Sequence, residues 1–272
     1  MPTHVVTDTL TLLRRNLRHT VRYPSMTIGA VVGPVIMLLL FVGVLGKTLG
    51  TGLASGGTGL TGTGLTSTAH PAAYIAYIAP GIIITAVASG SMATAVAVCV
   101  DMTEGVVDRF RTMPVSRVAI LAAHVINSML TTIVATAGVA VVSVALGFRP
   151  HATTARWLAA AGLLVLLGLA LTWLAVAMGL VSATPEAASN SPMLIAILPF
   201  VGSAFAPAAL MPAGVRQFAE YQPFTPAIET VRGLLAGTPT GHNALLALGW
   251  CAVIGAGGYA WALAAFRTPR AH

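Results

Sequence analysis

The densest group of residues able to make specific polar contacts is the run at 101–117. It holds three acidic residues and three arginines, and Val106, Phe110 and Met113 share one face of the helix that the spacing predicts. A short helix with an apolar face surrounded by charges, here called the apolar knob, can bind in a groove of a partner protein. The alternative is a solvated loop whose charges balance. Periodicity alone favours the solvated loop, and protein recognition is the chemistry that this pattern could otherwise support.

Patterns that would indicate catalysis are missing from the sequence. An intramembrane serine protease needs Gly-x-Ser-Gly, and the nearest run, 87–90, begins with valine. The seven histidines are scattered and no His-Glu-x-x-His occurs. Three aspartates are too few for a patch that would hold the Mg²⁺ of a lipid-phosphate transferase. We therefore predict no catalytic residue and no metal site.

Two short runs match parts of nucleotide-binding motifs. The glycines of 57–62 satisfy G-x-G-x-x-G, but they lie in the Gly- and Thr-rich stretch 50–68, and no buried strand precedes them. Residues 43–48 resemble the end of a phosphate-binding loop, yet Phe41 stands where that loop needs its first glycine. We predict that the chain binds neither ATP nor a cofactor of its own.

Composition indicates a membrane protein. Apolar residues make up 56% of the chain and charged residues 8%, against about 25% charged in soluble domains. About 20 apolar residues suffice for one helical crossing of a bilayer. We expect an all-α polytopic protein in which 27–266 form one six-helix transmembrane domain. The predicted spans are 27–46, 72–100, 118–148, 157–183, 191–212 and 243–266.

Basic residues in the connecting segments predict the orientation. With six crossings both termini share a side, and the segments of that side carry nine Lys and Arg against five on the other. Cytoplasmic loops carry the excess of basic residues. Both termini, including the tail 267–272, are therefore predicted in the cytoplasm, with the protein in the cell membrane. The basic residues flank spans and form no single face, which argues against nucleic acid as a partner.

The segment 1–26 is predicted to be a cytoplasmic amphipathic helix that lies in the membrane interface. Its leucines and valines share one face, and its basic residues lie round the helix from them. The alternative is a simple basic anchor that sets the orientation. The arginines expected at the lipid headgroups are Arg14, Arg15, Arg18 and Arg22.

The segment 213–242, before the last span, combines aromatic residues with paired charges. Arg216 and Glu220 are spaced i, i+4. Aromatic residues at headgroup level and paired charges fit short helices that dip into the outer leaflet. We predict a re-entrant outer segment; the alternative is an interfacial hairpin without a further role. The residues singled out in it are Phe218, Tyr221, Glu229 and Arg232.

Several features inside the predicted spans point to the bundle interior. His124 and Asn127 are costly in lipid and should face the interior. The stretch 191–212 contains four prolines, which break helical hydrogen bonds, and broken helices often line a pathway. The candidate substrate contacts in this stretch are Met193, Phe200 and Phe205. The alternative is that these side chains only pack against lipid or other helices.

Two stretches of this sequence resemble the type-2 ABC transporter permeases, the family that includes exporters of drugs, polysaccharides and lipids. The first is Glu104-Gly105 followed by 109–111 and 113–117. The second contains Met211-Pro212 and 232–235. The first is similar to the family's cytoplasmic signature after span two, and the second to its stretch before the last span.

This resemblance implies a permease whose motor is a separate ATPase subunit, which would bind ATP and Mg²⁺. The loop 101–117 would be the coupling helix in the ATPase cleft, and 213–242 would form the outer gate. A second permease chain, identical or different, would complete the route. The ATPase contacts implied are Glu104, Val106, Arg109, Phe110, Arg111 and Met113.

The function implied by the resemblance is export of a hydrophobic or amphiphilic substrate, such as a drug, an antibiotic or a lipid. The alternative is an ion-coupled secondary transporter of a small hydrophobic solute. That mechanism requires carboxylates near the bilayer midplane. None of the seven acidic residues falls within the interior of a predicted span, which favours the ATP-driven exporter.

Overall fold

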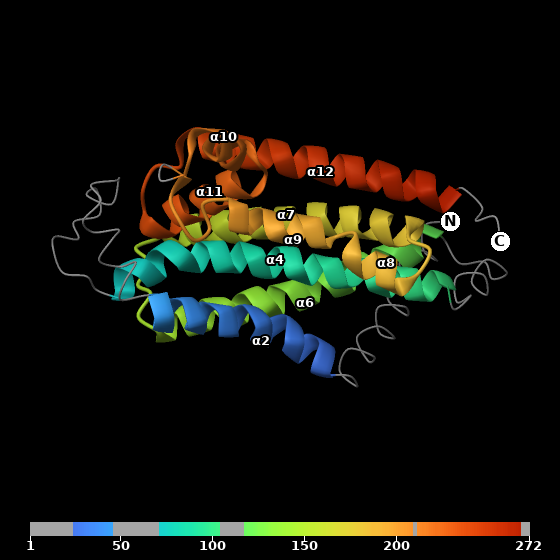
Figure 1. Ribbon diagram of the computed structural model, residues 1–272, viewed down its shortest axis with the longest axis horizontal. Helices are drawn as coiled ribbons and strands as arrows, with labels where there is room; N and C mark the ends of the chain where they lie inside the picture. The colour runs from blue at the N-terminus through green and yellow to red at the C-terminus, as the bar shows by residue number, and fades with distance from the viewer. Residues whose placement is uncertain (1–23, 46–70, 104–116, 209–210, 268–272) are drawn as a thin grey trace.

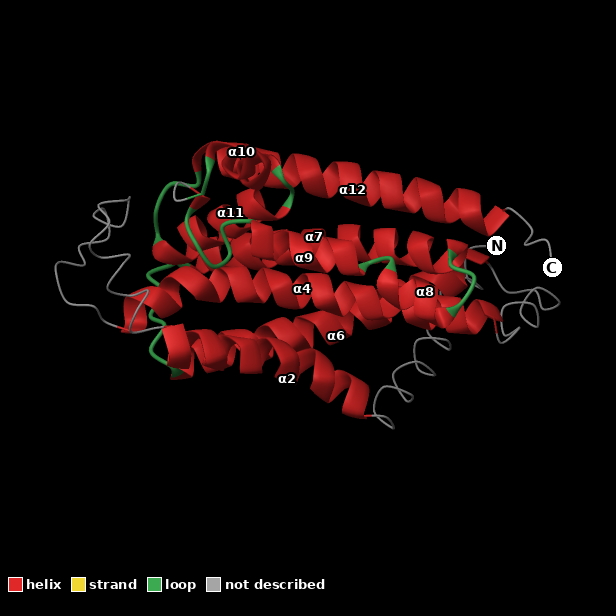
Figure 2. Ribbon diagram, in the orientation of Figure 1, coloured by secondary structure: helices red, strands yellow, loops and turns green. Residues whose placement is uncertain are grey.

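The computed structural model describes residues 24–45, 71–103, 117–208 and 211–267, and all its regular elements there are helices (Figure 2). The long helices run side by side along one axis (Figure 1). The all-α prediction is confirmed. The elements are α2 (Pro24–Leu40), η1 (Phe41–Leu45), α4 (Pro71–Thr103), α6 (Arg117–Ala145), α7 (Thr154–Val181), α8 (Pro185–Asn190), α9 (Met193–Val201), α10 (Ala213–Tyr221), α11 (Phe224–Ala236) and α12 (Gly241–Arg267).

Four helices, α4, α6, α7 and α12, are long and apolar enough to cross a membrane. They correspond to the second, third, fourth and sixth predicted spans. The first span coincides with α2 and η1, which contain a shorter apolar helix over Val31–Val44. The fifth predicted span, 191–212, contains the nine residues of α9 followed by turns. Because nine residues rise about 14 Å, α9 alone does not cross, and the count of six spans is not confirmed.

Helix α4 is the centre of the bundle. Of its most apolar stretch, 72% is buried, against 28% for α6, and it packs against α2, α6, α7, α8, α9 and α11. Small residues allow these close contacts, as is common between membrane helices. A Cβ on Gly179 of α7 would lie 2.4 Å from the Ala95 carbonyl oxygen, and one on Gly81 would lie 2.6 Å from the Ala204 carbonyl oxygen.

Hydroxyl groups join the three central helices. The Thr172 hydroxyl of α7 lies 3.3 Å from that of Ser128 in α6 and donates to that of Ser91 in α4 across 3.4 Å. All three side chains are buried. Hydroxyl pairs of this kind hold membrane helices together where the surrounding lipid offers no hydrogen-bonding partner.

The two ends of the bundle differ. One end carries Thr103 of α4, Arg117 of α6, the last turn of α12 and α8; the other carries α10 and α11 (Figure 1). The predicted loop 101–117 and outer segment 213–242 thus begin from opposite ends. Glu186 lies in α8, where hydrogen bonds from its own backbone N–H and from the Thr184 hydroxyl hold the pKa of its carboxyl below the usual value. At the same end, His124 is 11% exposed, which confirms that it faces inward.

Three predicted features lie outside the described residues. They are the interfacial helix with Arg14, Arg15, Arg18 and Arg22, the loop 104–116 with its six predicted ATPase contacts, and the tail from 268.

The contact between Gly179 and Ala95 predicts the outcome of a matched pair of substitutions in α7. Gly179→Ala forces a methyl group against the Ala95 carbonyl, and overpacking of this kind costs about 1–3 kcal/mol. Gly162→Ala, in the same helix, meets nothing within 4 Å. In one detergent, the melting temperature of the purified protein should fall for Gly179→Ala and stay unchanged or rise for Gly162→Ala. Equal melting temperatures would contradict the close α4–α7 contact.

Candidate functional site

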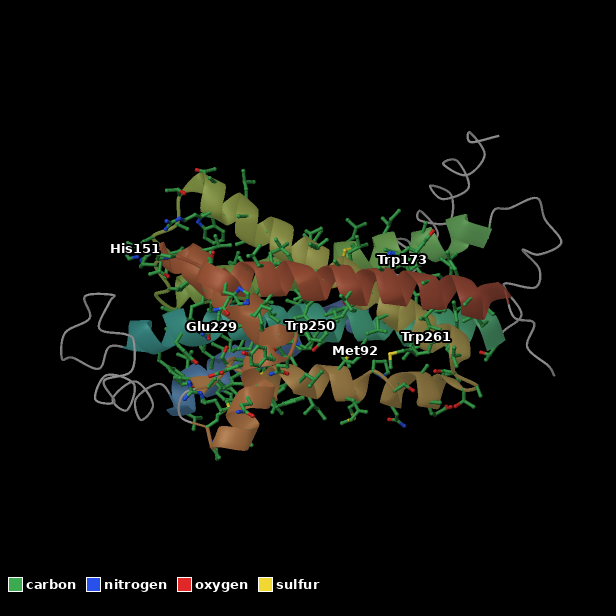
Figure 3. All side chains as sticks on the ribbon, turned by 90° about the horizontal axis from the view of Figure 1, so that it is seen from above. Met92, His151, Trp173, Glu229, Trp250 and Trp261 are labelled. Atoms are coloured by element: carbon green, nitrogen blue, oxygen red, sulfur yellow. The ribbon has the colours of Figure 1, made fainter. Side chains whose placement is uncertain are left out.

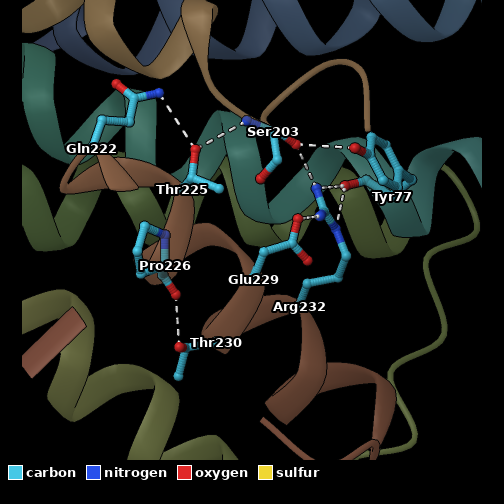
Figure 4. Close-up of polar contacts among 8 residues, drawn as sticks. All are labelled: Tyr77, Ser203, Gln222, Thr225, Pro226, Glu229, Thr230 and Arg232. Atoms are coloured by element: carbon cyan, nitrogen blue, oxygen red, sulfur yellow. Dashed lines mark hydrogen bonds and ion pairs between the residues drawn. The ribbon is translucent and has the colours of Figure 1, made fainter. Parts of the chain in front are cut away.

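A polar cluster forms where α11 meets α4 and the turn after α9. Its centre is Arg232, whose side chain is 14% exposed. The Arg232 Nε and Nη2 donate to the Tyr77 carbonyl at 3.2 and 3.1 Å, and Nη2 also donates to the Ser203 carbonyl at 2.9 Å (Figure 4). Its Nη1 lies 2.5 Å from Glu229 Oε1. One guanidinium thus binds three separate segments of the chain.

The cluster lies toward one end of the bundle. In Figure 3, Glu229 is near the end marked by His151, the connection between α6 and α7, and away from Trp173 and Trp261. This is the end that carries α10 and α11.

Two backbone irregularities lie at this place. Ser203 follows the end of α9, so its carbonyl accepts no helical hydrogen bond. Pro80 lies inside α4, where it removes the helical donor of the Ala76 carbonyl and disturbs the turn that also contains Tyr77. The Tyr77 ring lies 3.8 Å below the Arg232 guanidinium carbon, and its hydroxyl donates to the Ser203 carbonyl at 3.1 Å.

A second set of contacts fastens the turn after α9 to α11. The Thr225 hydroxyl oxygen accepts hydrogen bonds from the Ser203 backbone N–H and from the Gln222 amide, both at 3.3 Å. Gly202 is required for this approach: a Cβ there would lie 2.4 Å from the Gln222 nitrogen and 2.6 Å from the Thr225 hydroxyl oxygen. The turn is therefore held from both sides, by Arg232 and by Thr225.

Three phenylalanines stack beside this turn. The Phe205 ring lies between Phe41 of η1, at a centroid distance of 4.6 Å, and Phe200 of α9, at 5.0 Å. The structure thus brings together Phe200 and Phe205, two of the predicted substrate contacts. Met193, the third, lies at the opposite end of α9, and the side chains of Met193 and Phe200 are both exposed.

The structure divides the four residues singled out in 213–242. Glu229 and Arg232 form the cluster, whereas Phe218 and Tyr221 lie on α10 with exposed side chains. The Tyr221 carbonyl accepts a hydrogen bond from the Trp250 indole at 3.0 Å. The i, i+4 pair of Arg216 and Glu220 is present at 2.6 Å and is exposed.

Sequence reasoning missed Tyr77, Ser203, Gln222 and Thr225. Tyr77 and Ser203 contact Arg232 through their backbone carbonyls, and no sequence pattern reports such contacts. The available signals were Pro80 within an apolar span and Gly202 amid the prolines of 191–212.

The comparisons with known proteins cover most of the chain. Residues 7–236 match the family model described as ABC-2 type transporter. The chain belongs to the ABC-2 type transporter family. It is also 28% identical over 234 residues to the daunorubicin resistance ABC transporter permease protein DrrB1 of Streptomyces coeruleorubidus, an alignment that covers 86% of this chain and 76% of the relative.

Membership in the ABC-2 family confirms the resemblance found in the sequence. The chain is a multi-pass permease subunit of an ABC transporter, and the family implies an ATPase subunit as its partner. The matched region contains both the loop 101–117 and the Arg232 cluster.

The cluster predicts a large difference between two arginines of the ABC-2 permease. Arg232→Gln leaves Glu229 without its cation and two carbonyls with fewer donors. The free energy of unfolding should therefore fall by about 3 kcal/mol. Arg216→Gln breaks an exposed pair worth about 0–1 kcal/mol. Thermal melting of the purified permease should show a marked fall for Arg232→Gln and little change for Arg216→Gln. Similar melting temperatures for the two variants would refute the central role of Arg232.

Proposed function

We propose that the chain is the permease subunit of an ATP-driven exporter that moves a hydrophobic or amphiphilic, drug-like substrate out of the cell. It works with an ATPase subunit and a second permease chain, with both termini in the cytoplasm. The observation that carries this proposal is the placement of α4, the central helix, which runs from the Arg232 cluster to Thr103, where the loop 104–116 begins (Figure 1). The relative's name, with its daunorubicin resistance, supports a drug-like substrate.

The coupling to the ATPase is assigned to the loop between α4 and α6. Val106, Phe110 and Met113 form the apolar knob, and the charged residues beside them make polar contacts to the ATPase cleft. Closure of the ATPase subunits on ATP displaces this knob. Because α4 packs against six other α-helices in the described part of the chain, it transmits the displacement along its length instead of bending.

The outer gate is assigned to the Arg232 cluster. Arg232 ties α11 to the Tyr77 carbonyl of α4 and to the Ser203 carbonyl after α9. A shift of α4 along its axis moves the Tyr77 carbonyl away from the guanidinium. The hydrogen bonds that hold the turn after α9 against α4 are then exchanged, and this end of the bundle opens.

The substrate path is assigned to the face of α9 that carries Met193 and Phe200, together with Phe205 in the turn that follows. Exposed aromatic and methionine side chains suit amphiphilic molecules, because aromatic rings stack and methionine adapts to irregular shapes. In the paired transporter this face meets the second permease chain, so that substrate passes between the two.

The ion-coupled alternative is disfavoured by the state of the described carboxylates. Asp101 in α4 and Glu229 in α11 each have a basic partner, His124 and Arg232. A coupling-ion site needs carboxylates available to a cation near the bilayer midplane. Purified permease that accumulated solute on an ion gradient without an ATPase would support the alternative.

The coupling assignment is tested by Phe110→Asp. The charge should abolish copurification of the ATPase subunit and transport, because it places an anion in the apolar part of the contact. Membrane insertion should be unchanged. Val215→Asp, an exposed apolar residue of α10 at the opposite end, is the control and should retain the ATPase. Normal transport by Phe110→Asp would overturn the assignment.

The path assignment is tested by Phe200→Ala. The readout is uptake of daunorubicin into inverted membrane vesicles that contain the permease and its ATPase subunit. Loss of the ring should raise the KM about two- to tenfold with little change in the maximal rate. Val253→Ala, exposed on α12, should leave the KM unchanged. An unaltered KM for Phe200→Ala would remove this residue from the path.

A further inference from the structure

A polar pair links α4 to α6 at the end of the bundle where the loop 104–116 begins and ends. His124 Nε2 of α6 lies 3.0 Å from Asp101 Oδ2 in the last turn of α4, and the two side chains are 11% and 22% exposed. Among the described side chains, the pairs of Arg216 with Glu220 and of Arg232 with Glu229 each lie within one helix. The Asp101–His124 pair joins two.

Apolar residues adjoin this pair along both helices. Val98 and Leu121, three residues before Asp101 and His124, and Val125 belong to a buried cluster that also contains Val176 and Leu180 of α7. Polar groups in such a place are costly unless each satisfies the other. Because two well-packed apolar residues would be at least as stable, the pair is better explained by the fixed geometry it imposes than by stability.

The same part of α4 is also fixed to α7. The Cys99 thiol contacts the Ser182 carbonyl at 3.4 Å, and Gly179 packs directly on Ala95. Helix α6 packs on α4 as well, and a Cβ on Gly90 would lie 2.6 Å from the Thr132 hydroxyl oxygen. On its other sides α6 has less support, since 28% of its most apolar stretch is buried, against 56% for α7. The Asp101–His124 pair adds a directional link between α4 and α6 at the end where the loop is attached.

We propose that Asp101 and His124 are positioning residues for energy coupling: their pair makes the ends of α4 and α6 move as one body when the ATPase displaces the loop between them. The inference rests on the proposed function, since it assumes that the loop receives the displacement. It assigns to this pair the task of keeping α6 in step with α4, which carries the Tyr77 carbonyl at its other end. Neither residue contacts substrate or nucleotide in this account.

The experiment uses the complete transporter, permease with its ATPase subunit, in proteoliposomes. The variants are Asp101→Leu, His124→Leu, the double leucine variant, and the exchanged pair Asp101→His with His124→Asp. Three quantities are measured for each: copurified ATPase, melting temperature, and daunorubicin transported per ATP hydrolysed. The double leucine variant separates stability from coupling, because it removes both polar groups together.

The leucine variants should retain the ATPase subunit and hydrolyse ATP, while daunorubicin transported per ATP falls about three- to tenfold. The double leucine variant should recover its melting temperature without recovering this ratio. The exchanged pair should recover both. A ratio that stays normal in the single variants, or that recovers together with melting temperature in the double leucine variant, overturns the proposal.

Failure of this proposal is distinguishable from failure of the proposed function. If Phe110→Asp transports normally, the loop is not the coupling element. If Phe110→Asp loses the ATPase but the Asp101 and His124 variants transport normally per ATP, the loop couples and the pair has no part in it.

Discussion

The structure depends on satisfying backbone polar groups where the chain is irregular inside an apolar bundle. A bilayer offers no hydrogen bonds, so each carbonyl released from a helix needs an internal donor. The Ser203 carbonyl in the turn after α9 and the Tyr77 carbonyl of α4 lie side by side, and the guanidinium of Arg232 donates to both. Glu229 balances the charge that this solution introduces.

That solution makes one side chain a junction of three elements. Arg232 holds α11 on α4, and through Ser203 it holds the segment that follows α9. The other side of the same turn is held by Thr225. The most buried of the four long helices, α4, therefore connects the charged junction at one end with the Asp101–His124 pair at the other.

Much of the architecture was predictable because hydropathy reports long apolar helices well. The spans matched by α4, α6, α7 and α12 were predicted from composition, and the inward position of His124 followed from the cost of a polar ring in lipid. The spacing of Arg216 and Glu220 gave their pair directly. The residues that resemble the ABC-2 signatures identified the family before any contact was known.

The contents of the candidate site were less accessible to sequence reasoning. Glu229 and Arg232 stood out as charges, but Tyr77 and Ser203 contribute through backbone carbonyls, whose availability depends on where a helix bends or ends. Phe218 and Tyr221 were grouped with the charges because they are near in sequence. They belong to α10, however, and lie outside the cluster. The stretch 191–212 is apolar enough for a span, yet its prolines end α9 after nine residues.

The hydroxyl junction of Ser91, Thr172 and Ser128 gives the middle of the bundle a different character from its ends. The Ser91 hydroxyl also reaches the Val87 carbonyl of its own helix at 3.0 Å. It therefore accepts from Thr172 and donates to its own backbone at the same time, so the hydrogen bonds run in one chain from α6 through α7 to α4. A lengthwise shift of any of the three helices would break this chain inside an apolar interior, so the junction fixes their mutual register.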